Sequence, residues 1–106
     1  MAAALEHSEF SKHLNSNFRI RIGEEQTVDA ELVEITELMV SSRQERFAIV
    51  FRTSNDLFVG QGLWPMEHDQ MGKFELFLVP IGRGEKGTSY EAVFNRLVDQ
   101  SSKVPQ

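Results

Sequence analysis

The prediction of a β fold rests on the stretch Phe18-Arg19-Ile20-Arg21-Ile22. Its apolar residues alternate strictly with arginines, and side chains two apart share one side of a β-strand. The stretch is therefore predicted to be a half-buried strand with its apolar side facing inward. Arg19 and Arg21 share the other side, which we interpret as a solvated face.

The same alternation continues after a turn at residues 23–25, but it changes phase partway. The apolar positions are first Val28, Ala30 and Leu32, and then Val33 and Ile35. One extra residue near Leu32 and Val33 would keep both sets pointing inward. We therefore predict a β-bulge or bend there, which is how long strands of a small sheet curve toward closure.

Two later segments are apolar on both faces, which is typical of central strands. They are residues 47–51 and residues 74–81, and the second is the most apolar run in the chain. Pro80 lies near the end of that run, where a missing donor is tolerated. Shorter strands are predicted at residues 57–59 and 63–68.

Residues 89–100 fit two structures. As a helix, the segment has an apolar stripe at three- and four-residue spacing, and Thr88 with Glu91 forms a capping box. As a strand, it pairs with residues 74–81 across a glycine-rich loop. Its Tyr, Val and Phe residues favour the strand.

The start of the chain predicts a short helix at residues 7–14. Phe10 and Leu14 lie four apart on one face, Ser8 is placed to cap the first turn, and Asn15 tolerates the left-handed conformation that ends a helix. The prediction is thus a single domain over residues 1–106. It is all-β, an antiparallel barrel or sandwich of about six or seven strands at 17–97, with one N-terminal helix and a flexible tail at 98–106.

The charge balance limits the partners of this domain. Eleven basic and 16 acidic residues give a formal charge of −5, which argues against nucleic acid or an anionic membrane as the main partner. The chain has no cysteine, so disulfides and thiolate chemistry are excluded. It shows neither a leader pattern nor a long apolar run, and we expect a cytoplasmic protein.

The triplet Glu67-His68-Asp69 has the residue types of a catalytic site. On a strand its two acids point to one side and His68 to the other, so the three do not converge. We interpret His68 as a residue that ends a strand and bonds the following turn, holding Gly72 in place. The alternative is a ligand-binding or hydrolase-like barrel in which His68 acts with Glu67 or Glu91.

Trp64, Pro65 and Met66 form a candidate interaction site, because aromatic residues and methionine concentrate at the energetic centres of interfaces. The competing interpretation is core, because residues 64, 66 and 68 share one face. Pro65 indicates an edge strand. Such an edge is suited to pairing with another copy or with another protein.

Other chemistry has no support in the sequence. Residues 82–87 spell G-x-G-x-x-G, but they lack the strand–helix–strand context of a dinucleotide site and fit a hairpin loop. His7 and His13 are six apart and face different sides of a helix. No serine lies in a G-x-S-x-G turn. We predict no catalytic residue, no metal and no cofactor.

Three blocks of the sequence resemble a family of small bacterial domains of unknown function. The blocks are GQGLWPMEHDQMG at 60–72, FLVPIG at 77–82 and YEAVFNR at 90–96, and the likeness extends over residues 10–97. The resemblance implies a stand-alone β-rich protein, often encoded beside phage-tail-collar-like proteins, and supplies no catalytic residue. Together these observations favour a non-enzymatic protein-interaction or assembly module, accessory to a phage-tail-like particle, that binds a protein or self-associates.

Overall fold

The computed structural model describes residues 6–42, 44–53, 59–85 and 87–97. The elements are helix α1 (His7–Ser11) and strands β1 (Asn17–Arg21), β2 (Thr27–Ile35), β3 (Met39–Val40), β4 (Gln44–Thr53), β5 (Gly62–His68), β6 (Gly72–Gly84) and β7 (Gly87–Leu97). The tail predicted at 98–106 lies outside the described residues, as do two of the three residues of the strand predicted at 57–59. The third, Val59, is described and belongs to no strand.

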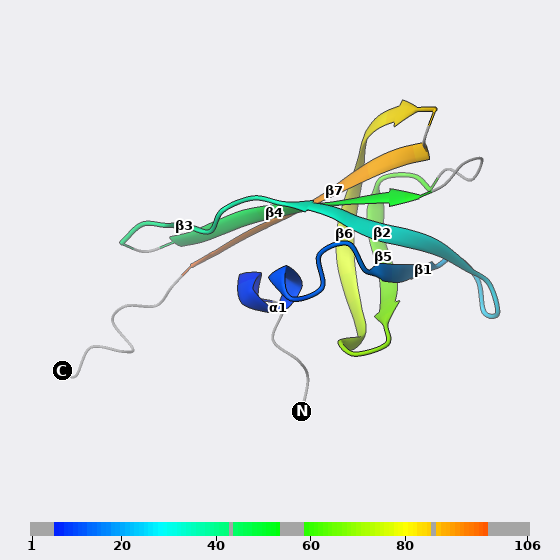
Figure 1. Ribbon diagram of the computed structural model, residues 1–106, viewed down its shortest axis with the longest axis horizontal. Helices are drawn as coiled ribbons and strands as arrows, with labels where there is room; N and C mark the ends of the chain where they lie inside the picture. The colour runs from blue at the N-terminus through cyan, green and yellow to red at the C-terminus, as the bar shows by residue number, and fades with distance from the viewer. Residues whose placement is uncertain (1–5, 43, 54–58, 86, 98–106) are drawn as a thin grey trace.

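The strands form a small antiparallel barrel (Figure 1). Six of them follow the order β2-β1-β5-β6-β7-β4, and pairing of β4 with β2 closes the ring. β3 is an extra strand that pairs with β4 beyond the end of β2. The predicted fold class, a small antiparallel all-β barrel with one short N-terminal helix, is confirmed.

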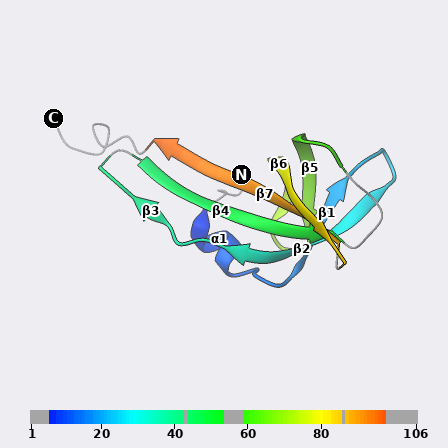
Figure 2. The same cartoon turned by 90° about the horizontal axis from the view of Figure 1, so that it is seen from above.

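Two long strands project from the barrel as an arm. β4 and β7 pair along ten residue positions, from Thr53↔Thr88 to Gln44↔Leu97. β6 follows β7 only as far as Val79↔Glu91, and β2 follows β4 only as far as Ile35↔Ile49. The remaining parts of β4 and β7, with β3, extend away from the ring, as Figures 1 and 2 show, and the molecule measures 54 × 29 × 24 Å.

Two register shifts bend the sheet. One lies between Leu32 and Glu34 in β2, which confirms the bulge predicted from the change of phase. The other lies between Pro80 and Gly82 in β6. Pro80 is therefore not near a strand end, as we expected, because β6 continues to Gly84. The bulge accommodates the proline instead, at the point where β6 changes partner from β5 to β7.

The segment with two possible structures is strand β7. Its helical interpretation is wrong because ten residue pairs with β4 order it as a strand, and this pairing is invisible to local periodicity. Tyr90 and Ala92 are buried, whereas Val93 points outward. The hairpin is tighter than predicted, since β6 runs to Gly84 and β7 begins at Gly87, where φ is 127°.

Helix α1 lies under the arm (Figure 1) and ends at Ser11, earlier than the predicted Leu14. Glu6, not Ser8, occupies the N-cap position, and it makes no side-chain capping bond. Asn15 has the predicted positive φ, at 70°. The helix is held by Phe10, which is fully buried. Its ring contacts four other phenylalanines, from β1, β4, β6 and β7: Phe18, Phe47, Phe74 and Phe94.

Candidate functional site

His68 lies inside the barrel at the end of β5, with only 6% of its surface exposed. Its Nδ1 accepts hydrogen bonds from the backbone N–H groups of Gln70 and Met71, at 3.0 and 3.2 Å. These bonds close the turn that leads to Gly72, whose φ is 85°. The structure confirms the interpretation of His68 as the residue that ends the strand and bonds the turn.

This arrangement fixes where the proton of the imidazole lies. Because Nδ1 accepts two bonds, the neutral ring carries its proton on Nε2. Nε2 is 3.0 Å from Oγ of Ser16, and that hydroxyl donates to the carbonyl of His13 at 2.6 Å. The imidazole is thus the donor to the serine. A serine nucleophile needs the opposite polarity, with a histidine lone pair that takes its proton.

The surroundings of His68 favour its neutral form. Burial, and next the neighbouring His13, hold the pKa of His68 below its ordinary value of 6.5. The rings of Phe18 and His13 lie 4.2 and 4.4 Å from it, centroid to centroid. Asp69 acts in the other direction and Arg19 in the same direction, both more weakly. A cation is poorly solvated there, and the neutral imidazole is the form whose Nδ1 accepts both bonds from the turn.

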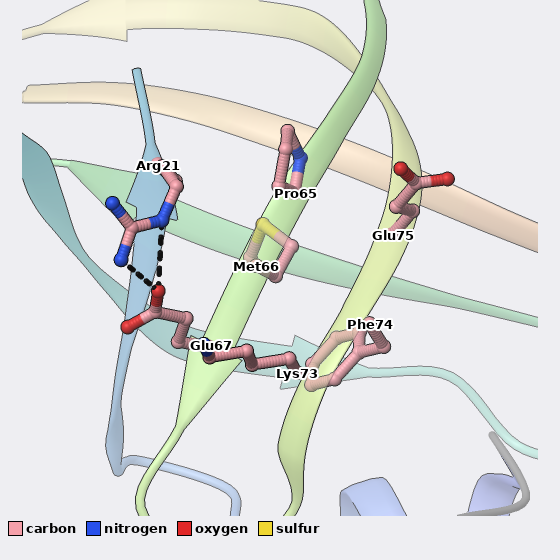
Figure 3. Close-up of a pocket in the computed structure, with 7 residues that line it drawn as sticks. All are labelled: Arg21, Pro65, Met66, Glu67, Lys73, Phe74 and Glu75. Carbon is pink, nitrogen blue, oxygen red and sulfur yellow. Dashed lines mark hydrogen bonds and ion pairs between the residues drawn. The ribbon is translucent and has the colours of Figure 1, made fainter. Parts of the chain in front are cut away.

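The two acids beside His68 point outward, as predicted. Glu67 accepts a hydrogen bond from Nε of Arg21 at 2.9 Å and a second from Nη2 of the same guanidinium (Figure 3). This contact holds the pKa of Glu67 below its ordinary 4.5. Arg19 bonds Asp69 at 2.9 Å. The arginine face of β1 is therefore a solvated face on which each arginine meets an acid, and the three side chains of the triplet do not converge.

A groove of about 430 Å³ runs beside this ion pair on the outer face of β1, β5 and β6. It is lined by Arg21, Pro65, Met66, Glu67, Lys73, Phe74 and Glu75 (Figure 3). The charges of Arg21 and Glu67 already satisfy each other across its wall. Lys73 and Glu75 are the other charged residues of the lining.

Glu91, the other partner considered for His68, is on the outer face of β7. It pairs in register with Val50 on one side and Val79 on the other. His68 points into the barrel, whereas Glu67 and Glu91 are on outer faces of different strands. The three residues of the hydrolase-like alternative are not brought together.

The candidate interaction residues of β5 are divided between core and surface. Met66 is fully buried, and Trp64 packs against the core while its Nε1 donates to the carbonyl of Gly60 at 2.8 Å. Only Pro65 is exposed among the three. β5 lies between β1 and β6, so it is not an edge strand as predicted, but its ladder with β1 ends at Met66 and leaves Pro65 just beyond it.

Several apolar side chains are exposed on the outer face of β5, β6, β7 and β3, and the sequence interpretation missed them. Leu63 and Phe77 are register partners with exposed fractions of 61% and 51%. Val93, 53% exposed, lies at the root of the arm, and Met39, 64% exposed, lies on β3. With two half-buried residues these form what we call the outer band. Its members are Leu63, Phe77, Val79, Val93, Ala48 and Met39.

The arm end of the outer band is hollowed into a groove of about 510 Å³. Its lining residues are Thr36, Glu37, Met39, Arg46, Phe47, Ala48, Glu91 and Val93. Arg46 and Glu91 make no ion pair or hydrogen bond with any other described residue. Arg46 and Val50, the register partner of Glu91, are four positions apart on β4, so the two charges are separated by roughly 13 Å along the strand.

Among the described residues, no group of three or more histidine, aspartate or glutamate side chains is placed to hold a metal ion. No helix there has the length and the apolar composition that a membrane span requires.

Comparison with families of known proteins matches residues 5–94 to a domain of unknown function, DUF6916. The chain belongs to this family. The DUF6916 match takes in helix α1 and every strand except the last three residues of β7, and it confirms the resemblance inferred from the sequence blocks. No curated protein and no solved structure matches the chain.

Proposed function

We propose that this DUF6916 domain is a non-enzymatic protein-interaction module whose docking surface is the outer band. The observation that carries the proposal is the exposure of Leu63, Phe77, Val93 and Met39, each more than half accessible, on one outer face of a barrel whose interior is well packed. We infer that these side chains act as one apolar patch, and such patches mark surfaces that a partner covers.

The band lies on a rigid support. It crosses β5, β6, β7, β4 and β3, and four of these strands belong to the closed barrel. Leu63 and Phe77 are held opposite each other by the β5–β6 ladder, and Ala48 and Val93 by the β4–β7 ladder. A partner therefore meets side chains whose backbone positions are already fixed, which lowers the entropic cost of binding.

Charges at the arm end of the band add selectivity. Glu91 and Arg46 flank an apolar floor made by Ala48 and Val93, and neither is neutralised by another described residue. A complementary partner presents an apolar side chain between a basic group facing Glu91 and an acidic group facing Arg46. Charges placed in this way select the partner and its orientation more than they add affinity.

We propose more specifically that the partner belongs to a phage-tail-like particle. This proposal is supported by the resemblance of the sequence blocks, which implies a protein often encoded beside phage-tail-collar-like proteins. If it holds, the tagged chain co-sediments with tail-like particles from its host on a density gradient. A chain that stays at the top of the gradient while the particles migrate would refute the association with the particle.

The experiment on the docking surface compares three forms of the tagged chain in affinity capture from the native host, with quantitative mass spectrometry. The forms are the wild type, the Leu63→Ser/Phe77→Ser double variant, and Glu75→Ser as a control on the same face of β6. We expect one or more specific proteins with the wild type and the control, and their loss from the double variant. Equal capture by all three forms would contradict the proposal.

A further inference from the structure

One edge of β7 is open along the arm. On one side β7 pairs with β4 through Leu97, but on the other side β6 pairs with it only from Gly84↔Gly87 to Val79↔Glu91. No described strand follows residues 92–97 on that side, and Figure 2 shows β7 at the border of the arm. Alternate residues of this six-residue stretch thus direct their backbone N–H and C=O groups toward the open side, where a further strand can pair with them.

Other open edges of the sheet have prolines, a bulge or a short length, and each of these features disfavours pairing with a further strand. Pro65 lies where the β5 edge becomes free of β1, and β6 has Pro80 and a bulge where it leaves β5. β3 is only two residues long. Residues 92–97 contain no proline, and their register with β4 has no shift. Among the described strands, this edge is the one left regular enough to act as a template.

We propose that two copies of this chain pair through residues 92–97 of β7, antiparallel, about a two-fold axis perpendicular to the arm. The unpaired N–H and C=O groups of a strand edge are bonded most completely by another strand. The same strand of a second copy can supply these bonds when the two run antiparallel. The barrel of each copy adjoins only the Glu91 end of its β7 edge. Antiparallel pairing places the two barrels at opposite ends of the shared sheet, so they do not collide.

The residues of this edge are compatible with self-pairing. Centring the two-fold axis on Phe94 or Asn95 keeps outer residues opposite outer residues, because both registers pair positions of the same parity. Position 96 holds the one charged residue of the six, and in these registers it faces position 92 or 94 of the other copy. No like charges are opposed. Val93 faces position 95 or 97.

Pairing of this kind needs no other protein and is independent of the docking function. If both hold, the dimer presents two outer bands on the same side of one continuous sheet, since an axis perpendicular to the sheet preserves its faces. A partner with repeated subunits then meets two docking surfaces at once, and the apparent affinity rises without any new contact.

Sedimentation equilibrium of the full chain tests the pairing, over about 10 µM to about 1 mM because short interfaces are weak. We expect the mass to rise from 12.1 kDa toward twice that value. Asn95→Lys places two charges near the axis and should remain monomeric with an unchanged circular dichroism spectrum. Gln44→Lys, on the β4 side of the arm, should dimerise like the wild type. A wild-type chain that is monomeric throughout overturns the proposal.

The absence of cysteine from the chain allows a second test by cross-linking. Single-cysteine variants at Val93 and Asn95 should form covalent dimers with a short bifunctional thiol reagent, and Gln44→Cys should not. A dimer that persists in Asn95→Lys, and that neither Val93→Cys nor Asn95→Cys captures, would show another interface and would equally overturn the proposal.

Discussion

Ser16 and His68 are joined by a hydrogen bond of 3.0 Å that runs from the imidazole Nε2–H to the serine hydroxyl. Ser16 also exchanges backbone contacts with its surroundings: its carbonyl accepts the N–H of Leu32, and its N–H donates to His13. The pair therefore ties the turn after α1 to β2 and to the end of β5. Ser16 and His68 lie as close as a nucleophile and its base, but their hydrogen bond joins structural elements.

Replacement of His68 by Ala should lower the free energy of unfolding by about 2–4 kcal/mol, because two backbone N–H groups lose their acceptor and a cavity opens beside Phe18. His68→Asn keeps an oxygen acceptor near the position of Nδ1 and should lose less. Urea titration of the two variants gives the comparison. Equal stability of wild type and His68→Ala would contradict the structural role.

Stability should fall as the pH is lowered through the region below about 6.5. The pKa of His68 is lowered in the folded state relative to its ordinary value of 6.5, so in that region the unfolded chain binds the proton more readily. The stabilisation is complete above the unfolded pKa and is lost as the pH falls toward the folded pKa.

Urea denaturation of wild type and His68→Asn at about pH 7.5 and about pH 5.5 measures this dependence. The difference in stability between the two pH values should be smaller in the variant. The charged and titratable neighbours named by the structure, His13, Asp69 and Arg19, remain in both proteins. An identical pH dependence would show that His68 is not responsible.

Phe10→Ala should cost about 3–5 kcal/mol, since this fully buried ring joins α1 to phenylalanines of β1, β4, β6 and β7. Leu14→Ala is the matched control, because Leu14 lies in the following turn and is 39% exposed. Its cost should be below about 1 kcal/mol. Similar losses for both variants in chemical denaturation would mean that α1 is not held by Phe10.

Gly72→Ala should destabilise the chain by about 1–2 kcal/mol, because φ at Gly72 is 85° and L residues rarely adopt that conformation. Gly82→Ala is the control on the same strand, where φ is not in the left-handed region and a Cβ meets no atom within 4 Å. Thermal or urea unfolding distinguishes the two. A neutral Gly72→Ala would show that the turn after His68 does not need this backbone conformation.

The fold was predictable where one phase of a strand is apolar and the other polar. The alternation around Phe18 and the phase change at Val33 specify which side faces inward, and they were enough for the all-β class and the bulge. Closure of the barrel through β2 and β4, and the length of the arm, depend on pairing between segments distant in sequence. No local period contains that information.

The outer band was missed for a related physical reason. In residues 76–79 both phases are apolar, so the pattern does not say that Leu76 and Leu78 face inward while Phe77 and Val79 face outward. The partner strands β5 and β7 make that choice. The role of His68 in the turn could be predicted from the sequence. His68 stands at the end of a strand, and the polar residues Asp69 and Gln70 and then Gly72 follow it, which is a turn pattern.

Site-specific photo-cross-linking in the native host tests the docking surface most directly. A photoreactive phenylalanine analogue replaces Phe77 in the outer band and, in separate cells, Glu75 two residues earlier on the same face and Glu25 in the hairpin between β1 and β2. We expect a covalent adduct to a partner protein from position 77, less from position 75 and none from position 25. Adducts from position 25 alone, or from none of the three positions, would contradict it.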